Sequence, residues 1–216
     1  VALAVDDEER ACRLLRILVV ADRLVPTDGE PAHLTGPGCE PAAIVVESVQ
    51  GNGGIVIPPD GFLAGLRELA RRHGIVLIFD EIVTGFRIAW GGAQEKYGVV
   101  PDLACYGKAV SGGYPLAAIA GSADVLSVLD ARARPRATVV WATNTLNGNP
   151  VCAAAGCAAL DVLRMPGVYD RLATVGRRLR EGMVAAGARH GFAVQAPGED
   201  AVFGIRFTDR RPLSNW

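Results

Sequence analysis

Three short apolar segments of the sequence each end in side chains that can do acid–base or carbonyl chemistry. They are residues 42–47, which end in Glu47; residues 75–79, followed by Asp80 and Glu81; and residues 103–106, followed by Gly107 and Lys108. If these segments are parallel strands, their carboxyl ends meet at one edge of a sheet, where ligands bind in open α/β folds. Carboxylates and an amine gathered there would suit acid–base or Schiff-base chemistry.

Lys108 is the most informative of these residues. An amine beside a partly dry pocket loses its proton more readily than one in water, because desolvation disfavours the charged form. The neutral amine is nucleophilic toward aldehydes. Taken alone, a surface lysine that caps a loop is the simpler interpretation, since lysines are mostly exposed.

Other polar residues near these strand ends also allow a structural interpretation. Asp80 is either a carboxylate that binds a backbone N–H after the strand or one that keeps a pyridine nitrogen protonated, so that the ring withdraws electrons. For Glu81 we expect an ion pair with a nearby arginine, such as Arg87. The segment from Thr145 to Asn149 precedes a predicted helix, where it either holds a phosphate at the helix N-terminus or simply caps the helix.

Periodicity and helix breakers predict the elements that position these side chains. We expect helices over residues 6–24, 59–73, 151–163 and 168–188, a loop over 26–41, and strands over 42–47, 75–79, 103–106, 115–120 and 200–207. The continuous apolar runs predict strands that are buried on both faces. The alternation of strands and helices predicts an α/β fold with a mostly parallel central sheet flanked by helices. We place a domain boundary after residue 165, and residues 166–216 begin a smaller α+β domain.

Composition excludes several classes of function. With 22 Lys+Arg against 23 Asp+Glu, the net charge is −1, which gives no electrostatic reason to expect nucleic acid or an acidic membrane as a partner. No apolar run approaches the ~20 residues that span a bilayer. Five cysteines without a C-x-x-C pair argue against a disulfide framework or a zinc site and predict a cytoplasmic protein. The glycine-rich stretches complete neither a dinucleotide fingerprint nor a Walker motif, which disfavours a nucleotide-binding α/β protein.

A series of short motifs runs in order over roughly half of the chain. They are Ile44-Val45-Val46-Glu47, Pro59-Asp60-Gly61-Phe62-Leu63, Leu77-Ile78-Phe79-Asp80-Glu81-Ile82, Thr84-Gly85-Phe86-Arg87, Gly91-Gly92-Ala93-Gln94, Tyr97-Gly98-Val99, Pro101-Asp102-Leu103, Gly107-Lys108, Gly112-Gly113-Tyr114-Pro115 and Thr145-Leu146-Asn147-Gly148-Asn149-Pro150. In order and spacing they resemble the class III pyridoxal-phosphate-dependent aminotransferases. Val83, where many members have Gln, makes the sequence most similar to the glutamate-1-semialdehyde 2,1-aminomutase branch.

The resemblance implies a role for each matching residue. Lys108 matches the lysine that forms a Schiff base with pyridoxal 5'-phosphate and shuttles the proton, and Asp80 matches the partner of the pyridine nitrogen. Ile82 matches an aliphatic side chain against one ring face. Thr145 matches a threonine that reaches the cofactor phosphate of the neighbouring subunit in a homodimer, and Glu47 matches a strand-end glutamate near the active site. The implied fold is fold type I, with residues 1–165 part of the large cofactor-binding domain and 166–216 the start of the small one.

The implied function is transfer of an amino group between a small-molecule amino donor and a keto or aldehyde acceptor. The protein would be an aminotransferase, or an intramolecular aminomutase of the glutamate-1-semialdehyde type, with its active site at a subunit interface. Ser48 stands where the family usually has Pro, so we expect a local change in loop rigidity. The family's phosphate loop and ring-stacking aromatic residue belong upstream of this sequence. The alternative is therefore a truncated, non-catalytic remnant that serves as an assembly module, and retention of Lys108 and Asp80 favours the enzyme.

Overall fold

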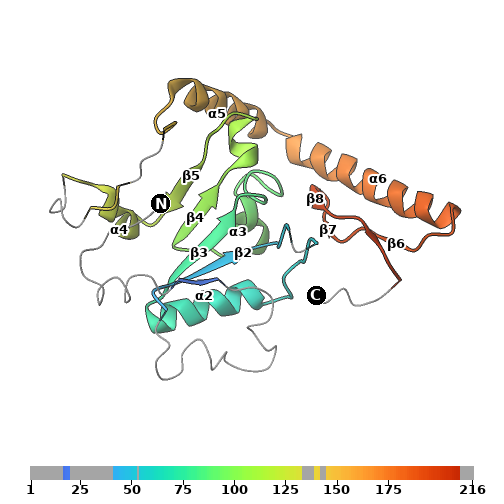
Figure 1. The fold of residues 1–216 in the computed structure, drawn as a ribbon, viewed down its shortest axis with the longest axis horizontal. Coiled ribbons are helices and arrows are strands. Elements are labelled where there is room, and N and C mark those ends of the chain that lie inside the picture. Colours follow the sequence, from blue (N-terminus) through green and yellow to red (C-terminus); the bar gives the residue numbers. More distant parts are fainter. Residues whose placement is uncertain (1–16, 20–40, 53, 133–138, 142–144, 210–216) are drawn as a thin grey trace.

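The centre of the molecule is a five-stranded sheet with strand order β1-β2-β3-β4-β5 (Figure 1). The computed structural model describes residues 17–19, 41–52, 54–132, 139–141 and 145–209. The strands are β1 (Ile17–Val19), β2 (Ala43–Glu47), β3 (Val76–Glu81), β4 (Leu103–Tyr106) and β5 (Ala118–Gly121). The pairs β1–β2, β2–β3 and β3–β4 are parallel, while β5 runs antiparallel to β4. The predicted α/β class with a mostly parallel sheet is confirmed.

Helices connect and cover these strands. They are α2 (Phe62–His73), α3 (Gly92–Tyr97), the 3-10 turn η1 (Lys108–Ser111), α4 (Ala123–Leu126), the 3-10 turn η2 (Ser127–Leu129), α5 (Pro150–Leu163) and α6 (Val168–Arg189). After α6, β6 (Val194–Gln195) pairs with β9 (Arg206–Phe207), and β7 (Gly198–Glu199) pairs with β8 (Val202–Phe203). The α2 helix ends at Gly74, whose φ of 65° closes the last turn through a bond to Ala70; glycine adopts this left-handed conformation at little cost.

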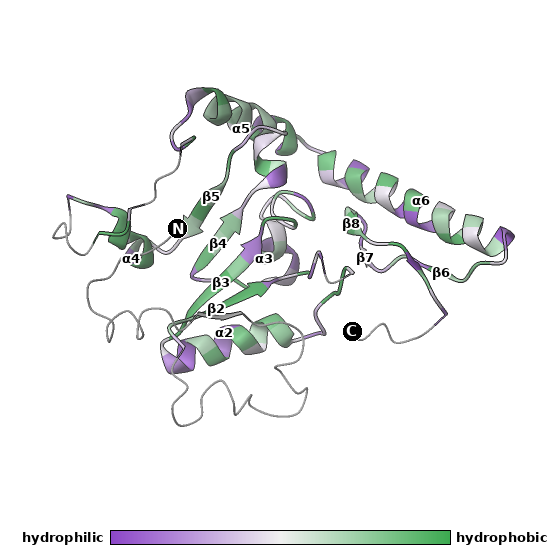
Figure 2. Cartoon of the chain, in the orientation of Figure 1, coloured by the Kyte–Doolittle hydropathy of each residue, from purple (hydrophilic) through white to green (hydrophobic). Residues whose placement is uncertain are grey.

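The hydrophobic core lies on one face of the sheet. Side chains alternate between the two faces of a strand, and the buried set on one face packs with the apolar side of α2. This set includes Ile44, Val46, Leu77, Phe79 and Ala104 from the strands and Leu63, Leu66 and Leu69 from the helix. The strands are accordingly among the most hydrophobic segments (Figure 2).

The opposite face of the sheet is only half-buried. Val45, Ile78 and Leu103 lie on that face, and each retains intermediate exposure. The prediction that the strands are buried on both faces is therefore wrong for the part of the chain that the structure describes. The half-buried face is the one that carries Glu47 and Asp80, so the covering helices leave the candidate chemistry accessible.

Three other predictions need correction. Ile17–Val19 forms a strand that pairs with β2, whereas we expected a helix over 6–24; the apolar run Ile-Leu-Val suits a strand, and sheet pairing overrides the helical spacing. The predicted strand over 200–207 is two short strands in different sheets. The strand expected over 115–120 begins only at Ala118. The rest of the helix predicted over 6–24 and nearly all of the loop predicted over 26–41 lie outside the described residues.

The chain bends between α5 and α6, whose axes differ by 81°, and the predicted domain boundary at residue 165 falls in this bend. That boundary stays a prediction. Beyond the bend, Glu199 accepts a hydrogen bond from the Tyr97 hydroxyl at 3.0 Å and pairs with Lys96 at 3.0 Å. These contacts attach the C-terminal strands to α3. Within the described ranges no single helix is long and apolar enough to cross a membrane, and only the bent pair of α5 and α6 meets the length and composition criteria together.

Candidate functional site

The register of the sheet places the sequence-predicted carboxylates side by side. Glu47 at the end of β2 is the neighbour of Asp80 in β3. Asp80 is in turn the neighbour of Cys105 in β4. Side chains at paired positions of a sheet point to the same face, so these three groups form a row across the half-buried face. All three have intermediate exposure.

Asp80 keeps one carboxylate oxygen available at this face. Its Oδ1 accepts a hydrogen bond from the backbone N–H of Ile82 at 3.0 Å, while no described residue donates to Oδ2. Burial, and then the charge of Asp80, raise the pKa of the Cys105 thiol above its ordinary value. That effect on Cys105 agrees with the register, because a carboxylate raises the pKa of a thiol only when it lies close to it. Both interpretations of Asp80 are therefore compatible: it binds a backbone N–H and still has a free oxygen.

Glu47 is held in a similar way. Its Oε2 accepts a hydrogen bond from the backbone N–H of Gly51 at 2.8 Å. A Cβ atom at Gly51 would lie 3.2 Å from a methyl group of Val83, so the turn after β2 packs against the turn after β3. The two turns that follow the carboxylates therefore form a continuous rim at the carboxyl end of the sheet.

Ile82 packs against the turn that leads to Lys108. A Cβ atom at Gly107 would lie 3.0 Å from Ile82 Cδ1, tighter than an ordinary van der Waals contact. Gly107 itself is extended, with φ of −161°, so here the absent side chain matters rather than the backbone freedom. The structure thus brings Ile82 and the segment before Lys108 together.

Lys108 adopts a conformation that is uncommon for a lysine. It is the first residue of η1 and has φ of +47°, in the left-handed region that side chains other than glycine disfavour. Non-glycine residues persist in such conformations where the surrounding structure enforces them, and they cluster at functional sites. Here α5 packs on η1, since a Cβ at Gly156 would lie 3.4 Å from the Val110 carbonyl oxygen and one at Gly112 3.4 Å from Ala159 Cβ.

The structure leaves Lys108 exposed, whereas the sequence analysis expected a partly dry pocket. The described residues alone do not enclose its amine. Only one other lysine exists in the 216-residue sequence, Lys96, and its amine pairs with Glu199 at 3.0 Å. Lys108 makes no ion pair with any described residue. Its side chain is therefore the one lysine amine that the described contacts leave available for covalent chemistry.

Thr145 has no described contact with the row of carboxylates. It is exposed in the turn before α5, and no described hydrogen bond joins it to Glu47, Asp80 or Lys108. The N-cap of α5 is Asn149, whose Oδ1 accepts hydrogen bonds from the backbone N–H groups of Val151 at 3.0 Å and Cys152 at 3.1 Å. The helix-cap interpretation of this segment is confirmed for Asn149, and the role of Thr145 stays a prediction.

Glu81 does not pair with Arg87, and that prediction is wrong. Its side chain is fully buried on the face opposite Asp80. There it accepts hydrogen bonds from the backbone N–H of Ala93 at 2.6 Å and from the Thr84 hydroxyl at 3.2 Å. Alternation along β3 sends consecutive carboxylates to opposite faces, so Glu81 points into the core, where these donors satisfy it.

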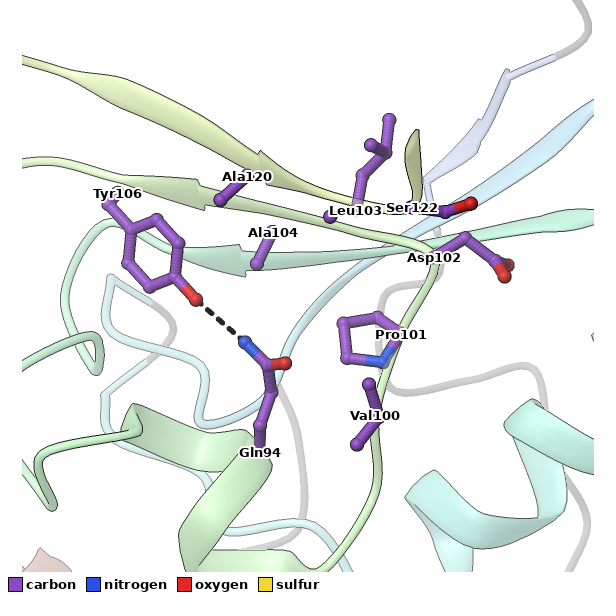
Figure 3. Close-up of a pocket in the computed structure, with 10 residues that line it drawn as sticks. Gln94, Val100, Pro101, Asp102, Leu103, Ala104, Tyr106, Ala120 and Ser122 are labelled. Atoms are coloured by element: carbon purple, nitrogen blue, oxygen red, sulfur yellow. Dashed lines mark hydrogen bonds between the residues drawn. The ribbon is translucent and has the colours of Figure 1, made fainter. Parts of the chain in front are cut away.

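A hollow of about 290 Å³ lies beside β4 and β5 on the same face as Glu81 (Figure 3). Its lining includes Tyr106 and Gln94, whose side chains meet in a hydrogen bond of 2.7 Å from Gln94 Nε2 to the Tyr106 hydroxyl. Because Ala104 and Tyr106 point to the face opposite Cys105, this hollow is separate from the row of Glu47 and Asp80.

Sequence reasoning missed several residues of the site. Cys105 and Gln94 received no role, although a register built on the predicted strands puts Cys105 beside Asp80. The tight contact between Gly107 and Ile82 and the left-handed backbone of Lys108 leave no signal in a single sequence. They depend on how η1 packs under α5, which residue spacing does not determine.

Comparison with known proteins places this arrangement in a family. The sequence profile named aminotransferase class-III matches residues 38–214. The chain is 45% identical over 177 residues to a glutamate-1-semialdehyde 2,1-aminomutase of Nitrosospira multiformis, which covers 82% of this chain and 40% of that protein. It is similar in structure to an omega-transaminase from Sphaerobacter thermophilus, with a TM-score of 0.71 and 38% identity over 78% of this chain and 37% of the other.

A second structural relative was solved with cofactor. It is the FumI protein of Sphingopyxis sp. MTA144 in its pyridoxal-phosphate internal aldimine form, with a TM-score of 0.66 and 27% identity over 77% of this chain and 39% of the other. The chain spans about two fifths of the length of the curated relatives that it matches, 38% to 40%. The α/β architecture is thus that of the fold type I transaminases. On the extent of the profile match, the chain belongs to the class-III aminotransferase family.

Proposed function

We propose that the carboxyl edge of β2, β3 and β4 binds pyridoxal 5'-phosphate and supports transfer of an amino group. The observation that carries the proposal is the convergence, at one sheet edge, of the Asp80 carboxylate with the backbone-strained and unpaired Lys108. Membership in the class-III family and the cofactor-bound relative support the same assignment.

The chemistry of the side chains at this edge fits the cofactor. When bound, pyridoxal 5'-phosphate supplies an aldehyde that condenses with primary amines and a pyridinium ring that withdraws electrons. Asp80 Oδ2, which accepts no hydrogen bond from the described residues, would accept one from a protonated ring nitrogen. Ile82 would pack on one face of the ring, and Glu47 would border the same site.

Lys108 would hold the cofactor through its Nζ atom and, once displaced by a substrate amine, move the proton during catalysis. Desolvation of the amine favours its unprotonated form, and the described residues leave Lys108 exposed. The proposal therefore includes polypeptide other than the described residues that shields the Lys108 amine from solvent. We assign part of it to a second copy of the chain in a homodimer, in which Thr145 contacts the cofactor phosphate of the partner subunit.

The proposed substrates are a small-molecule amino donor and a keto or aldehyde acceptor, and the cysteine pattern adds a cytoplasmic location to the proposal. The relatives divide between an aminomutase and a transaminase. The two activities differ in a simple assay. An aminomutase consumes glutamate-1-semialdehyde without an added partner, whereas a transaminase requires a separate donor and acceptor, as a screen of amines and keto acids would show.

The two lysines of the sequence allow a direct test of cofactor attachment. We would add pyridoxal phosphate to the purified protein, record the visible absorption band, reduce with borohydride and locate the label by peptide mass spectrometry. The label should lie on Lys108 in the wild type and in Lys96→Arg, and both band and label should vanish in Lys108→Arg. No band in the wild type, or a label on Lys96, would favour the non-catalytic assembly module instead.

A second variant tests the role of Asp80. Asp80→Asn should keep the cofactor attached and lower turnover by far more than about tenfold, which corresponds to ~1.4 kcal/mol of barrier. Turnover that stays within tenfold of the wild type would contradict the assignment of Asp80 to the ring nitrogen.

A further inference from the structure

Glu81 is a fully buried carboxylate between two residues of the proposed cofactor site, and the proposed chemistry gives it no part. Asp80 precedes it and Ile82 follows it, so any constraint on Glu81 also constrains them. No arginine or lysine contacts the Glu81 carboxylate among the described residues. A buried carboxylate without a cation needs several hydrogen-bond donors to offset its lost hydration.

These donors all come from the segment that follows β3. Oε2 accepts from the Thr84 hydroxyl at 3.2 Å and from the Ala93 N–H at 2.6 Å, and Oε1 accepts from Gln94 Nε2 at 3.3 Å. The N-cap residue of α3 is Gly91, which has no side chain to cap the helix, so Glu81 supplies that cap from the strand. Gly92, at φ of 63°, leaves room for the carboxylate, since a side chain there would collide with it.

The same cluster reaches β4, the strand that precedes Lys108. The Gln94 amide has two hydrogens, and Nε2 donates to the Tyr106 hydroxyl at 2.7 Å as well as to Glu81 (Figure 3). Tyr106 is paired with Glu81 in the register of β3 and β4 and lies two residues before Lys108. The Tyr106 ring also packs against Phe86, with ring centroids 5.2 Å apart.

We propose that Glu81 is a positioning residue that fixes the segment from Asp80 to Gln94 against the end of β4, and so sets where Asp80 and Ile82 stand relative to Lys108. This inference rests on the proposed function for its consequence in cofactor binding, but the positioning itself is measurable without cofactor. The shape and hydrogen-bond capacity of the side chain matter more than its charge.

The first test uses the cofactor-free protein. In Glu81→Ala, hydrogen exchange across residues 82–93 should accelerate by about tenfold or more, because the Ala93 N–H loses its acceptor and the segment loses the side chain that holds it. The pH midpoint of Cys105 alkylation should also move, because Asp80 is no longer held beside it. The matched control is Asp102→Ala, which removes a carboxylate that accepts from Leu77 N–H at 2.7 Å and pairs with Arg67 at 2.9 Å at the start of β4. Asp102→Ala should lower the free energy of unfolding without accelerating hydrogen exchange over residues 82–93 and without moving the pH midpoint of Cys105 alkylation.

The second test measures the dissociation constant of pyridoxal phosphate by absorbance. Glu81→Ala should weaken binding by about tenfold or more, as expected when groups that position a ligand shift. Glu81→Gln keeps one oxygen for Thr84 and Ala93, and a Gln94 amide that turns its oxygen inward can accept from the new N–H, so this variant should stay within about threefold. If Glu81→Ala does not fold, Gln94→Ala removes the hydrogen bonds to Tyr106 and to Glu81 Oε1 but leaves those from Thr84 and Ala93, and it should show the same effects in smaller size.

The outcomes separate the two proposals. If wild-type protein takes no cofactor on Lys108, the proposed function fails, and the exchange and alkylation results still decide the role of Glu81. The inference is overturned if Glu81→Ala and Asp102→Ala give the same exchange over residues 82–93, or if Glu81→Gln is as impaired as Glu81→Ala.

Discussion

The left-handed backbone of Lys108 makes an unusual prediction: replacing the proposed catalytic lysine by glycine should stabilise the protein. Lys108 has φ of +47° and an exposed side chain, so its replacement removes little packing. A left-handed conformation costs a residue with a Cβ atom roughly 1–2 kcal/mol. Glycine avoids that cost but has about 0.5–1 kcal/mol more conformational entropy to lose on folding. The expected net gain for Lys108→Gly is therefore about 0.7 kcal/mol.

Two variants make the comparison specific. Lys108→Ala removes the amine but keeps the Cβ atom, so its free energy of unfolding should stay near that of the wild type. Ala109 is the next residue of η1 and is not among the residues with positive φ, so Ala109→Gly should destabilise the protein by about 0.5–1 kcal/mol. The two glycine variants, at adjacent positions, should therefore change the free energy of unfolding in opposite directions.

The measurement is urea unfolding followed by far-ultraviolet circular dichroism, supported by thermal unfolding, where about 0.7 kcal/mol corresponds to roughly 2 °C. If Lys108→Gly is no more stable than Lys108→Ala, the turn does not impose strain on residue 108. A more stable glycine variant that no longer holds cofactor would show that the protein gives up stability to present this amine.

Three further predictions concern individual contacts. Alkylation of Cys105 should have its pH midpoint shifted to lower pH in Asp80→Asn, because burial and then the Asp80 charge raise the thiol pKa; an unchanged midpoint would place Asp80 elsewhere. The pKa of Tyr97 is raised well above its ordinary value by burial, then by the charge of Glu199 and the hydrogen bond to it. The protonated hydroxyl therefore contributes stability below pH about 10 that is lost as the pH rises further. Tyr97→Phe should lower the free energy of unfolding by about 1 kcal/mol at neutral pH. Denaturation curves above pH 10 should show a smaller difference between the variant and the wild type, and a difference that does not change with pH would contradict this. Ser48 is fully buried and no described group bonds its hydroxyl, so Ser48→Ala should raise the free energy of unfolding by about 1 kcal/mol. A lower free energy of unfolding in the same denaturation curves would show that the hydroxyl has a hydrogen-bond partner.

The strands that carry the site were predictable because their signal is local. Residues 43–47 and 103–106 are short apolar runs bounded by turn residues, and both are strands close to the predicted limits. The placement of Glu47 beside Asp80 followed from one rule, that parallel strands present their carboxyl ends at the same edge. Ile17–Val19 was wrongly predicted as part of a helix, because the helical spacing around it extends over several turns. Its pairing with β2 is a non-local contact that residue spacing does not reveal.

The partners of the charged residues were harder to predict than their positions. Arg87 is close to Glu81 in sequence, yet the partners of a buried carboxylate are the hydrogen-bond donors that the fold brings to it. Here these are the Thr84 hydroxyl, the Ala93 N–H in the first turn of α3 and the amide of Gln94. The exposure of Lys108 has a similar cause, because the dryness of a pocket depends on all of its walls and the described residues form only some of them.

The adjacency of Asp80 and Glu81 has a consequence for how the sequence can change over time. The pleat of β3 assigns one carboxylate to the open face and the next to the interior, so a deletion of one residue within the strand would exchange the two assignments. A glutamate would then stand in the row of Glu47 and Cys105, and the shorter aspartate would face α3 without reaching Ala93. Drift in this strand is therefore confined to substitutions, and its length is as tightly constrained as the identity of its two acids.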